Sequence, residues 1–151
     1  MDHPFPKSVS LASIVRSLAP LGMTICLAAC ASISRHQFAE PARDWQVRSG
    51  QLLYRTQKTT LIGEVLVRFS KSGDFELTFS KGPGVTLLIL RQDATFSEVK
   101  GPLARQGWSG PIERAPSQLR GWLGLRDKLL HARDRQPIRH VAGPETFLLR
   151  F

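Results

Sequence analysis

The chain has 151 residues and a formal net charge of +9 at pH 7, with 21 Lys and Arg against 12 Asp and Glu. This basic balance favours anionic partners such as phospholipid headgroups, and its alternative role is to keep the protein soluble. Nucleic acid is excluded from the expected partners, because the sequence has no nucleic-acid motif and no interleaved basic and aromatic repeats.

The first 29 residues have the order of a secretory signal. Lys7 and Arg16 precede an uncharged, mainly apolar run that extends from residue 17 to residue 29. A charged start, a short apolar run and small residues before a cleavage point are typical of a signal peptide. The run is too short for a spanning helix, which needs about 20 apolar residues. We therefore predict that residues 1–29 are a signal peptide.

A cysteine stands directly after this run. The segment Leu27, Ala28, Ala29 and Cys30 resembles the lipobox of bacterial lipoproteins, an aliphatic residue and two small residues before an invariant cysteine. The resemblance implies cleavage before Cys30, diacylglycerol on its thiol and a stable membrane anchor, since two acyl chains hold a protein firmly. Cys26 would leave with the signal, so no intramolecular disulfide could form. Ala31 and Ser32 then imply sorting to the outer membrane, on its periplasmic face.

The chain after the cysteine divides into a tether and a folded domain. Residues 30–44 show no apolar periodicity and are expected to form a lipidated tether, with the domain over residues 45–151. In the domain, apolar and polar residues alternate in the manner of half-buried strands. Strands are predicted over residues 47–54, 60–69, 74–80, 85–91 and 94–100.

The second half of the domain is predicted to supply a helix. Residues 101–116 are rich in Gly and Pro and are expected to form an irregular crossing. Ser117 could cap a helix with one apolar face, formed by Leu119, Trp122, Leu123, Leu129 and Leu130. Gly121 and Gly124 each cost about 1 kcal/mol relative to Ala, which predicts a short or broken helix. Residues 126–139 are expected to be solvated, and residues 146–151 to form a last strand.

These elements predict an α+β fold. Consecutive strands with short turns favour a curved antiparallel sheet, and the apolar helix could cover its concave face. The expected architecture is an incomplete barrel with a short helical lid.

Three segments of the domain resemble LolB, the outer-membrane receptor of bacterial lipoprotein sorting. They are residues 45–50 (WQVRSG), residues 75–90 with FELTF, a Pro-Gly turn and a final apolar strand, and residues 119–125 (LRGWLGL). The resemblance extends from residue 45 to about residue 125. It implies a LolA/LolB-like half-barrel whose apolar interior holds the acyl chains of a lipoprotein delivered by a periplasmic carrier. No cofactor and no covalent chemistry are implied.

The same resemblance implies candidate sites. Side chains expected to line an apolar cavity are Phe75, Leu77, Phe79, Leu88, Leu90, Leu119, Trp122 and Leu123. Alternating Phe and Leu also form ordinary protein cores, so a core is the alternative interpretation. A membrane-facing loop would contain Pro83, Gly84 and Val85, although this loop lacks the Leu that the family carries at its tip.

No enzyme is predicted. The histidines after residue 30 are His36, His131 and His140, without metal-ligand spacing, and no Gly-x-Ser-x-Gly motif is present. No catalytic residue, metal or cofactor is therefore expected. Three functions remain as hypotheses: binding of lipid or lipoprotein acyl chains, docking of a periplasmic envelope partner without carrying lipid, and binding of anionic lipid through the basic surface alone.

Overall fold

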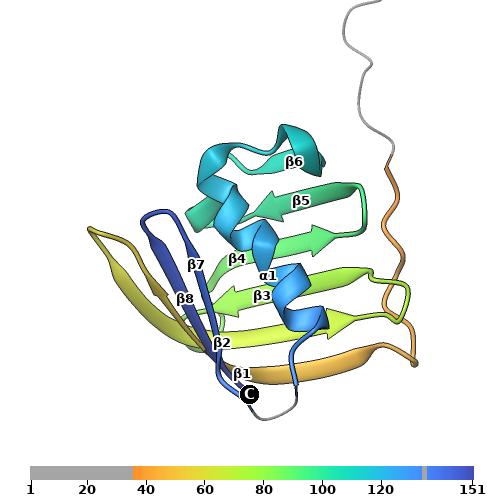
Figure 1. The fold of residues 1–151 in the computed structure, drawn as a ribbon, viewed down its shortest axis with the longest axis horizontal. Coiled ribbons are helices and arrows are strands. Elements are labelled where there is room, and N and C mark those ends of the chain that lie inside the picture. Colours follow the sequence, from red (N-terminus) through yellow and green to blue (C-terminus); the bar gives the residue numbers. More distant parts are fainter. Residues whose placement is uncertain (1–35, 134–135) are drawn as a thin grey trace, which may run out of the picture. The chain divides into compact units, whose positions relative to one another are not determined.

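Eight antiparallel strands form one open sheet in the computed structural model, which describes residues 36–133 and 136–151 (Figure 1). Their order is β6-β5-β4-β3-β2-β1-β8-β7, so β6 and β7 are the edges. The strands are β1 (Gln46–Arg55), β2 (Thr60–Phe69), β3 (Phe75–Ser80), β4 (Thr86–Gln92), β5 (Phe96–Lys100), β6 (Trp108–Pro111), β7 (Ile138–Ala142) and β8 (Glu145–Arg150). The prediction of a curved, incomplete antiparallel sheet with a short helix is confirmed.

The alternation of side chains fixes which face of the sheet is buried. Val67 of β2 lies opposite Leu77 of β3, which lies opposite Leu90 of β4, which in turn lies opposite Val99 of β5. All four side chains are fully buried. Successive residues of a strand point to opposite faces. The position of this one row therefore determines which alternate residues of β2 to β5 face the core.

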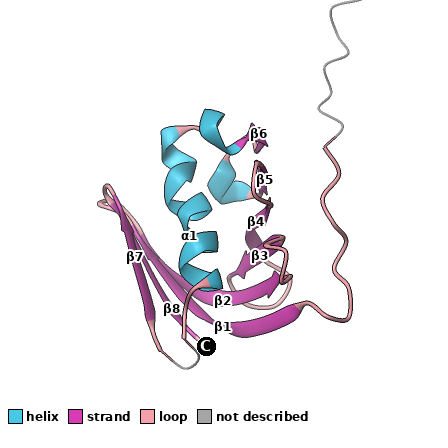
Figure 2. Ribbon diagram, turned by 45° about the vertical axis from the view of Figure 1, so that its right-hand side comes forward, coloured by secondary structure: helices cyan, strands magenta, loops and turns pink. Residues whose placement is uncertain are grey.

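In the described residues one α-helix, α1 (Arg120–Leu130), lies on the concave side of the sheet (Figure 2). Short 3-10 turns η1 (Pro102–Ala104), η2 (Ile112–Arg114) and η3 (Ser117–Leu119) lead into it. Its buried residues are Gly121, Trp122, Leu123, Leu125 and Leu129. The helix is continuous over 11 residues, so its two glycines do not break it.

The two glycines allow α1 to pack directly on β7 and β8. A Cβ atom at Gly121 would lie 2.9 Å from the ring of Phe147, and one at Gly124 would lie 2.8 Å from Nε2 of His140. Both distances are shorter than real Cβ contacts allow. Gly121 and Gly124 therefore lower helix propensity but are required by the packing.

Three sequence predictions are corrected by the structure. The crossing expected over residues 101–116 contains strand β6. The stretch expected to be solvated, residues 126–139, contains the end of α1, where Leu129 is fully buried, and the start of β7. Neither β6 nor β7 was expected as a strand. Each is a short edge strand that pairs on one side, with β5 and β8 respectively, so their apolar alternation is weak. Ser117 does not cap α1: it begins η3, and no side-chain hydrogen bond caps either element.

The described part of the expected tether contacts the domain. The His36 ring stacks on Phe96 with centroids 4.2 Å apart, and Nε2 of His36 lies 2.5 Å from Oδ2 of Asp93. The guanidinium of Arg91 lies over the ring of Phe38. Cys30, the other lipobox residues and the predicted signal peptide lie outside the described residues. In the part of the chain that the structure describes, no helix is long and apolar enough to cross a membrane.

We predict that Gly121→Ala destabilises the protein by about 1–3 kcal/mol, because the added methyl overlaps the Phe147 ring and the Glu145 carboxylate. Helix propensity alone predicts a gain of about 1 kcal/mol, so the two effects have opposite signs. Urea unfolding followed by circular dichroism measures the difference. Lys128→Ala, at an exposed position of the same helix, is the control and should change stability little. An unchanged or higher stability of Gly121→Ala would contradict the packing account.

Candidate functional site

The residues predicted to line a cavity form the core of the domain. Phe75, Leu77, Phe79, Leu88, Leu90, Leu119, Trp122 and Leu123 are all buried and belong to one cluster. The Trp122 ring centroid lies 4.9 Å from those of Tyr54 and Phe147 and 5.9 Å from that of Phe79. The space between α1 and these strands is thus occupied by aromatic side chains of the protein itself.

One end of the sheet gathers most of the turns. Because neighbouring strands are antiparallel, the β1–β2, β3–β4 and β7–β8 turns and the β5–β6 connection all lie at this end, here named the turn end. The β1–β2 and β7–β8 turns lie at the left of Figure 1. The predicted membrane-facing loop is the β3–β4 turn. Its Val85 is 51% exposed, and its backbone carbonyl accepts a hydrogen bond from the N–H of Lys81 at 2.9 Å.

An apolar cleft of about 540 Å³ opens at the turn end, between the first turn of α1 and the β7–β8 turn. Its lining is mainly nonpolar. The lining residues are Thr56, Ser117, Gln118, Arg120, Gly121, Ala142, Gly143, Pro144 and Glu145. The wall formed by the β7–β8 turn consists mainly of alanine, glycine and proline. Their small side chains leave the space of the cleft open.

A smaller polar cleft of about 230 Å³ adjoins the apolar cleft. It is lined by Tyr54, Leu103, Ala104, Arg105, Gln118, Leu119, Trp122 and Glu145. Gln118 and Glu145 line both clefts, so the two share a wall. Together they offer an apolar and a polar compartment side by side.

A partly buried hydrogen bond fixes the carboxylate in this shared wall. The hydroxyl of Tyr54, on β1, donates to Oε1 of Glu145, the first residue of β8, at 2.6 Å. Burial raises the pKa of Tyr54 well above its ordinary value, and the hydrogen bond and the charge of Glu145 raise it further. The hydroxyl therefore remains protonated and continues to donate.

Two arginines line the clefts. Arg105 follows η1 with φ 55°, and among the described residues it is the non-glycine residue with positive φ. Such a conformation costs roughly 1–3 kcal/mol and persists where the surrounding structure holds it. Within residues 36–133 and 136–151, the guanidinium groups of Arg105 and Arg120 make neither an ion pair nor a hydrogen bond.

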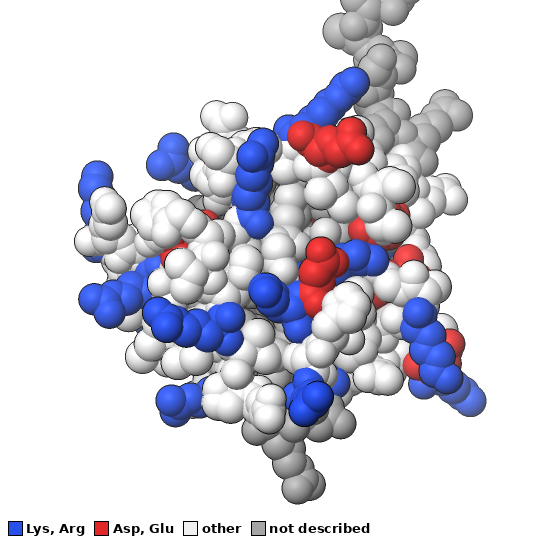
Figure 3. Space-filling model, in the orientation of Figure 1, with Lys and Arg blue, Asp and Glu red and all other residues white. Residues whose placement is uncertain are grey.

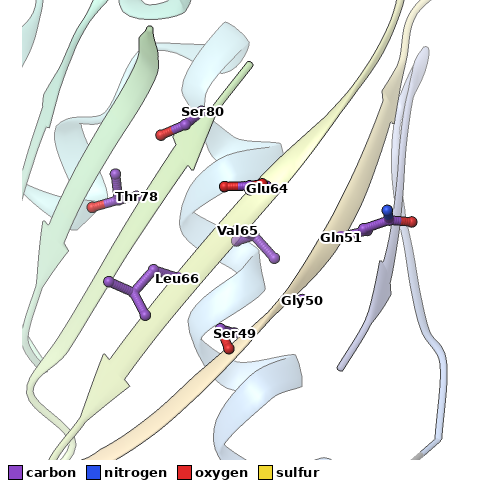
Figure 4. Close-up of a pocket in the computed structure, with 8 residues that line it drawn as sticks. All are labelled: Ser49, Gly50, Gln51, Glu64, Val65, Leu66, Thr78 and Ser80. Carbon is purple, nitrogen blue, oxygen red and sulfur yellow. The ribbon is translucent and has the colours of Figure 1, made fainter. Parts of the chain in front are cut away.

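The sheet face away from α1 carries a further hollow. Figure 4 shows this outer groove, which has a volume of about 640 Å³. It is lined by Ser49, Gly50, Gln51, Glu64, Val65, Leu66, Thr78 and Ser80. Near it, Ile62 lies opposite Leu53, which lies opposite Leu148, and the Ile62 side chain is 60% exposed.

The histidines that the structure describes make separate contacts. His36 contacts Asp93, while Nδ1 of His131 lies 2.8 Å from the carbonyl oxygen of Asp127 at the end of α1, and His140 lies against Gly124. Within the described ranges, no three His, Cys, Asp or Glu side chains are grouped so that they could hold a metal.

Sequence reasoning missed Tyr54, Arg105, Gln118 and Glu145. Tyr54 and Glu145 are separated by 91 residues, and no local motif joins them. The only sequence signal near Arg105 was the Gly and Pro content of its segment, which indicated irregular backbone but not a cleft. No family model and no curated protein matches the chain.

We predict that the stability of the protein falls as pH rises above about 10, and that Tyr54→Phe removes part of this fall. The pKa of Tyr54 is raised in the fold, so between the unfolded and folded values the folded state binds more protons. Its contribution to stability is therefore complete below pH 10 and is lost at higher pH. The free energy of unfolding of the wild type and of Tyr54→Phe, measured from pH 8 to beyond pH 10, tests this. If the free energies of the two proteins fall in parallel with pH, the prediction is wrong.

Proposed function

We propose that the chain is a lipid-anchored protein of the outer membrane, facing the periplasm, that binds an acyl chain of a lipid or lipoprotein at the turn end of its half-barrel. The observation that carries the proposal is the apolar cleft of about 540 Å³ beside the first turn of α1. A role in lipoprotein sorting or insertion follows from the LolB resemblance, with a periplasmic carrier as donor.

The cleft suits an acyl chain by size and lining. Each methylene moved from water into such a lining contributes roughly 0.8 kcal/mol, so a short length of chain gives useful affinity. The acyl chain would lie in the cleft and not between α1 and the sheet, because Trp122 and its aromatic neighbours already fill that inner space. This differs from the cavity that the family resemblance implies.

Exposed apolar side chains at the turn end support a membrane-facing orientation. Ile62, Val85 and Val141 are 60%, 51% and 53% exposed, and each lies in or near a turn at this end. Lys58 and Lys81 are exposed in the neighbouring turns. Near an anionic bilayer each basic residue contributes about 1 kcal/mol. Apolar and basic groups together favour contact with headgroups and the outermost part of the acyl chains.

Docking of an envelope partner is the second candidate function. It is favoured by the outer groove and by the cross-strand row Ile62, Leu53 and Leu148, which leaves apolar surface on the face away from α1. A partner seated there would require no lipid in the clefts. The two functions therefore use opposite faces of the same sheet.

We predict that Cys30→Ala releases the protein from the membrane fraction, because the variant lacks the thiol that carries diacylglycerol. Fractionation of cells and intact mass measurement test this. Cys26→Ala is the matched control: that residue leaves with the signal peptide, so the variant should remain anchored. Membrane sedimentation of Cys30→Ala with an unmodified mass would overturn the lipoprotein assignment.

We predict that the domain binds a fluorescent fatty acid and that Ala142→Phe weakens this binding about tenfold or more. Ala142 lines the apolar cleft, and a phenyl ring there would occupy the space of several methylenes. Val141→Phe is the control, because Val141 lies on the opposite face of β7 and is exposed. Fluorescence titration gives the dissociation constants.

Two results would decide against acyl-chain binding in the cleft. Equal affinities of wild type and Ala142→Phe would place the fatty acid elsewhere. No binding at all, with the fold verified by circular dichroism, would leave partner docking as the function.

A further inference from the structure

The polar cleft contains charges of both signs. Glu145 and Arg105 line it, and Gln118 and Glu145 separate it from the apolar cleft. A molecule with an apolar chain and a polar head could therefore extend from one compartment into the other. The charges indicate what kind of head would be complementary.

Glu145 is prepared to accept a cationic donor. Its Oε1 already accepts the hydroxyl of Tyr54 at 2.6 Å, which holds the carboxylate in place. Oε2 lies against Gly121, where the absence of a side chain leaves it room. A half-buried carboxylate with one oxygen committed and the other directed to a cleft binds an ammonium group with strong, charge-assisted hydrogen bonds.

Arg105 supplies the opposite charge. Arg105 lines the same cleft and, within the described part of the chain, its guanidinium forms no ion pair. Its backbone is held at φ 55°, a conformation that a non-glycine residue adopts at a cost. Strain of this kind persists where the surrounding structure holds the backbone, here through the hydrogen bond from the Arg105 N–H to the Pro102 carbonyl. A guanidinium is well matched to phosphate oxygens.

We propose that the two clefts bind a phospholipid of the ethanolamine class, with its ammonium group on Glu145, its phosphate on Arg105 and one acyl chain in the apolar cleft. The proposal rests on the proposed function, since it requires acyl-chain binding at the turn end. To acyl-chain binding it adds the class of lipid headgroup that the polar cleft binds.

The structure distinguishes ethanolamine from other common headgroups. A primary ammonium has three N–H donors for Glu145 and Gln118, whereas trimethylammonium has none. Trimethylammonium is normally held by open aromatic faces, but the rings of Tyr54 and Trp122 are 8% and 1% exposed and belong to the core. A glycerol headgroup offers no cation, so the lipid would bring net negative charge beside Glu145.

The test uses the detergent-extracted full chain and three lysophospholipids with the same palmitoyl chain and ethanolamine, choline or glycerol heads. Displacement of the fluorescent fatty acid gives their affinities. The ethanolamine lipid is expected to bind about tenfold more tightly than the other two, as the loss of one charged hydrogen bond implies. Native mass spectrometry of the same samples confirms one bound lipid.

Variants assign the two charges. Glu145→Gln, which can still accept the Tyr54 hydrogen bond, should abolish the preference for ethanolamine over choline and glycerol. Arg105→Gly removes the guanidinium and relieves the strained backbone, so it should weaken all three phospholipids without lowering stability. Arg114→Gln, at an exposed position of η2 that lines neither cleft, is the control and should leave the preference unchanged.

The outcomes separate this inference from the proposed function. Fatty-acid binding with equal affinities for the three lysophospholipids overturns the headgroup proposal and leaves acyl-chain binding intact. Failure of every amphiphile to bind, the fatty acid included, overturns both. A preference that persists in Glu145→Gln overturns the role of that carboxylate. If Glu145→Gln proves unstable, Gln118→Ala, at an exposed position that also lines the polar cleft, must reduce the preference.

Discussion

The close approach of α1 to β8 determines the rest of the structure. Gly121 brings the helix backbone against Phe147 and Glu145, and Gly124 does the same against His140. At this separation Trp122 projects into the sheet and is buried among aromatic rings. A larger residue at position 121 would lift the helix and open the core to water. The first turn of α1, the β7–β8 turn and the two clefts are therefore arranged by one contact.

Aromatic and aliphatic side chains fill the interior between α1 and the sheet. Protein interiors pack to the density of organic crystals, and an empty apolar space of acyl-chain size beneath α1 would be costly without its ligand. This sheet avoids that cost, because the side chains of Trp122 and Phe79 occupy the space. Two strand edges, β6 and β7, remain unpaired with each other. The accessible hollows are consequently at the turn end and on the outer face.

Charge and topology act together at the turn end. The antiparallel order gathers several turns there, and turns carry the exposed basic and apolar side chains. Figure 3 shows Lys and Arg side chains spread over much of the face that carries α1, with Asp and Glu confined to smaller patches. An anionic surface would be attracted to this face generally. Arg105 and Glu145 place charges of both signs at the polar cleft within this largely basic protein.

Local pattern determined much of this protein. Alternation of side chains located β1 to β5, because one face of each strand must be apolar, and the Leu-Ala-Ala-Cys motif at Cys30 indicates an anchor without reference to the fold. Only the tertiary structure determined that β6 and β7 form the two edge strands, because an edge strand needs little apolar alternation. It also decided that Tyr54 meets Glu145 across 91 residues. Such contacts depend on how distant segments pack, and nothing in the neighbouring sequence encodes their distance.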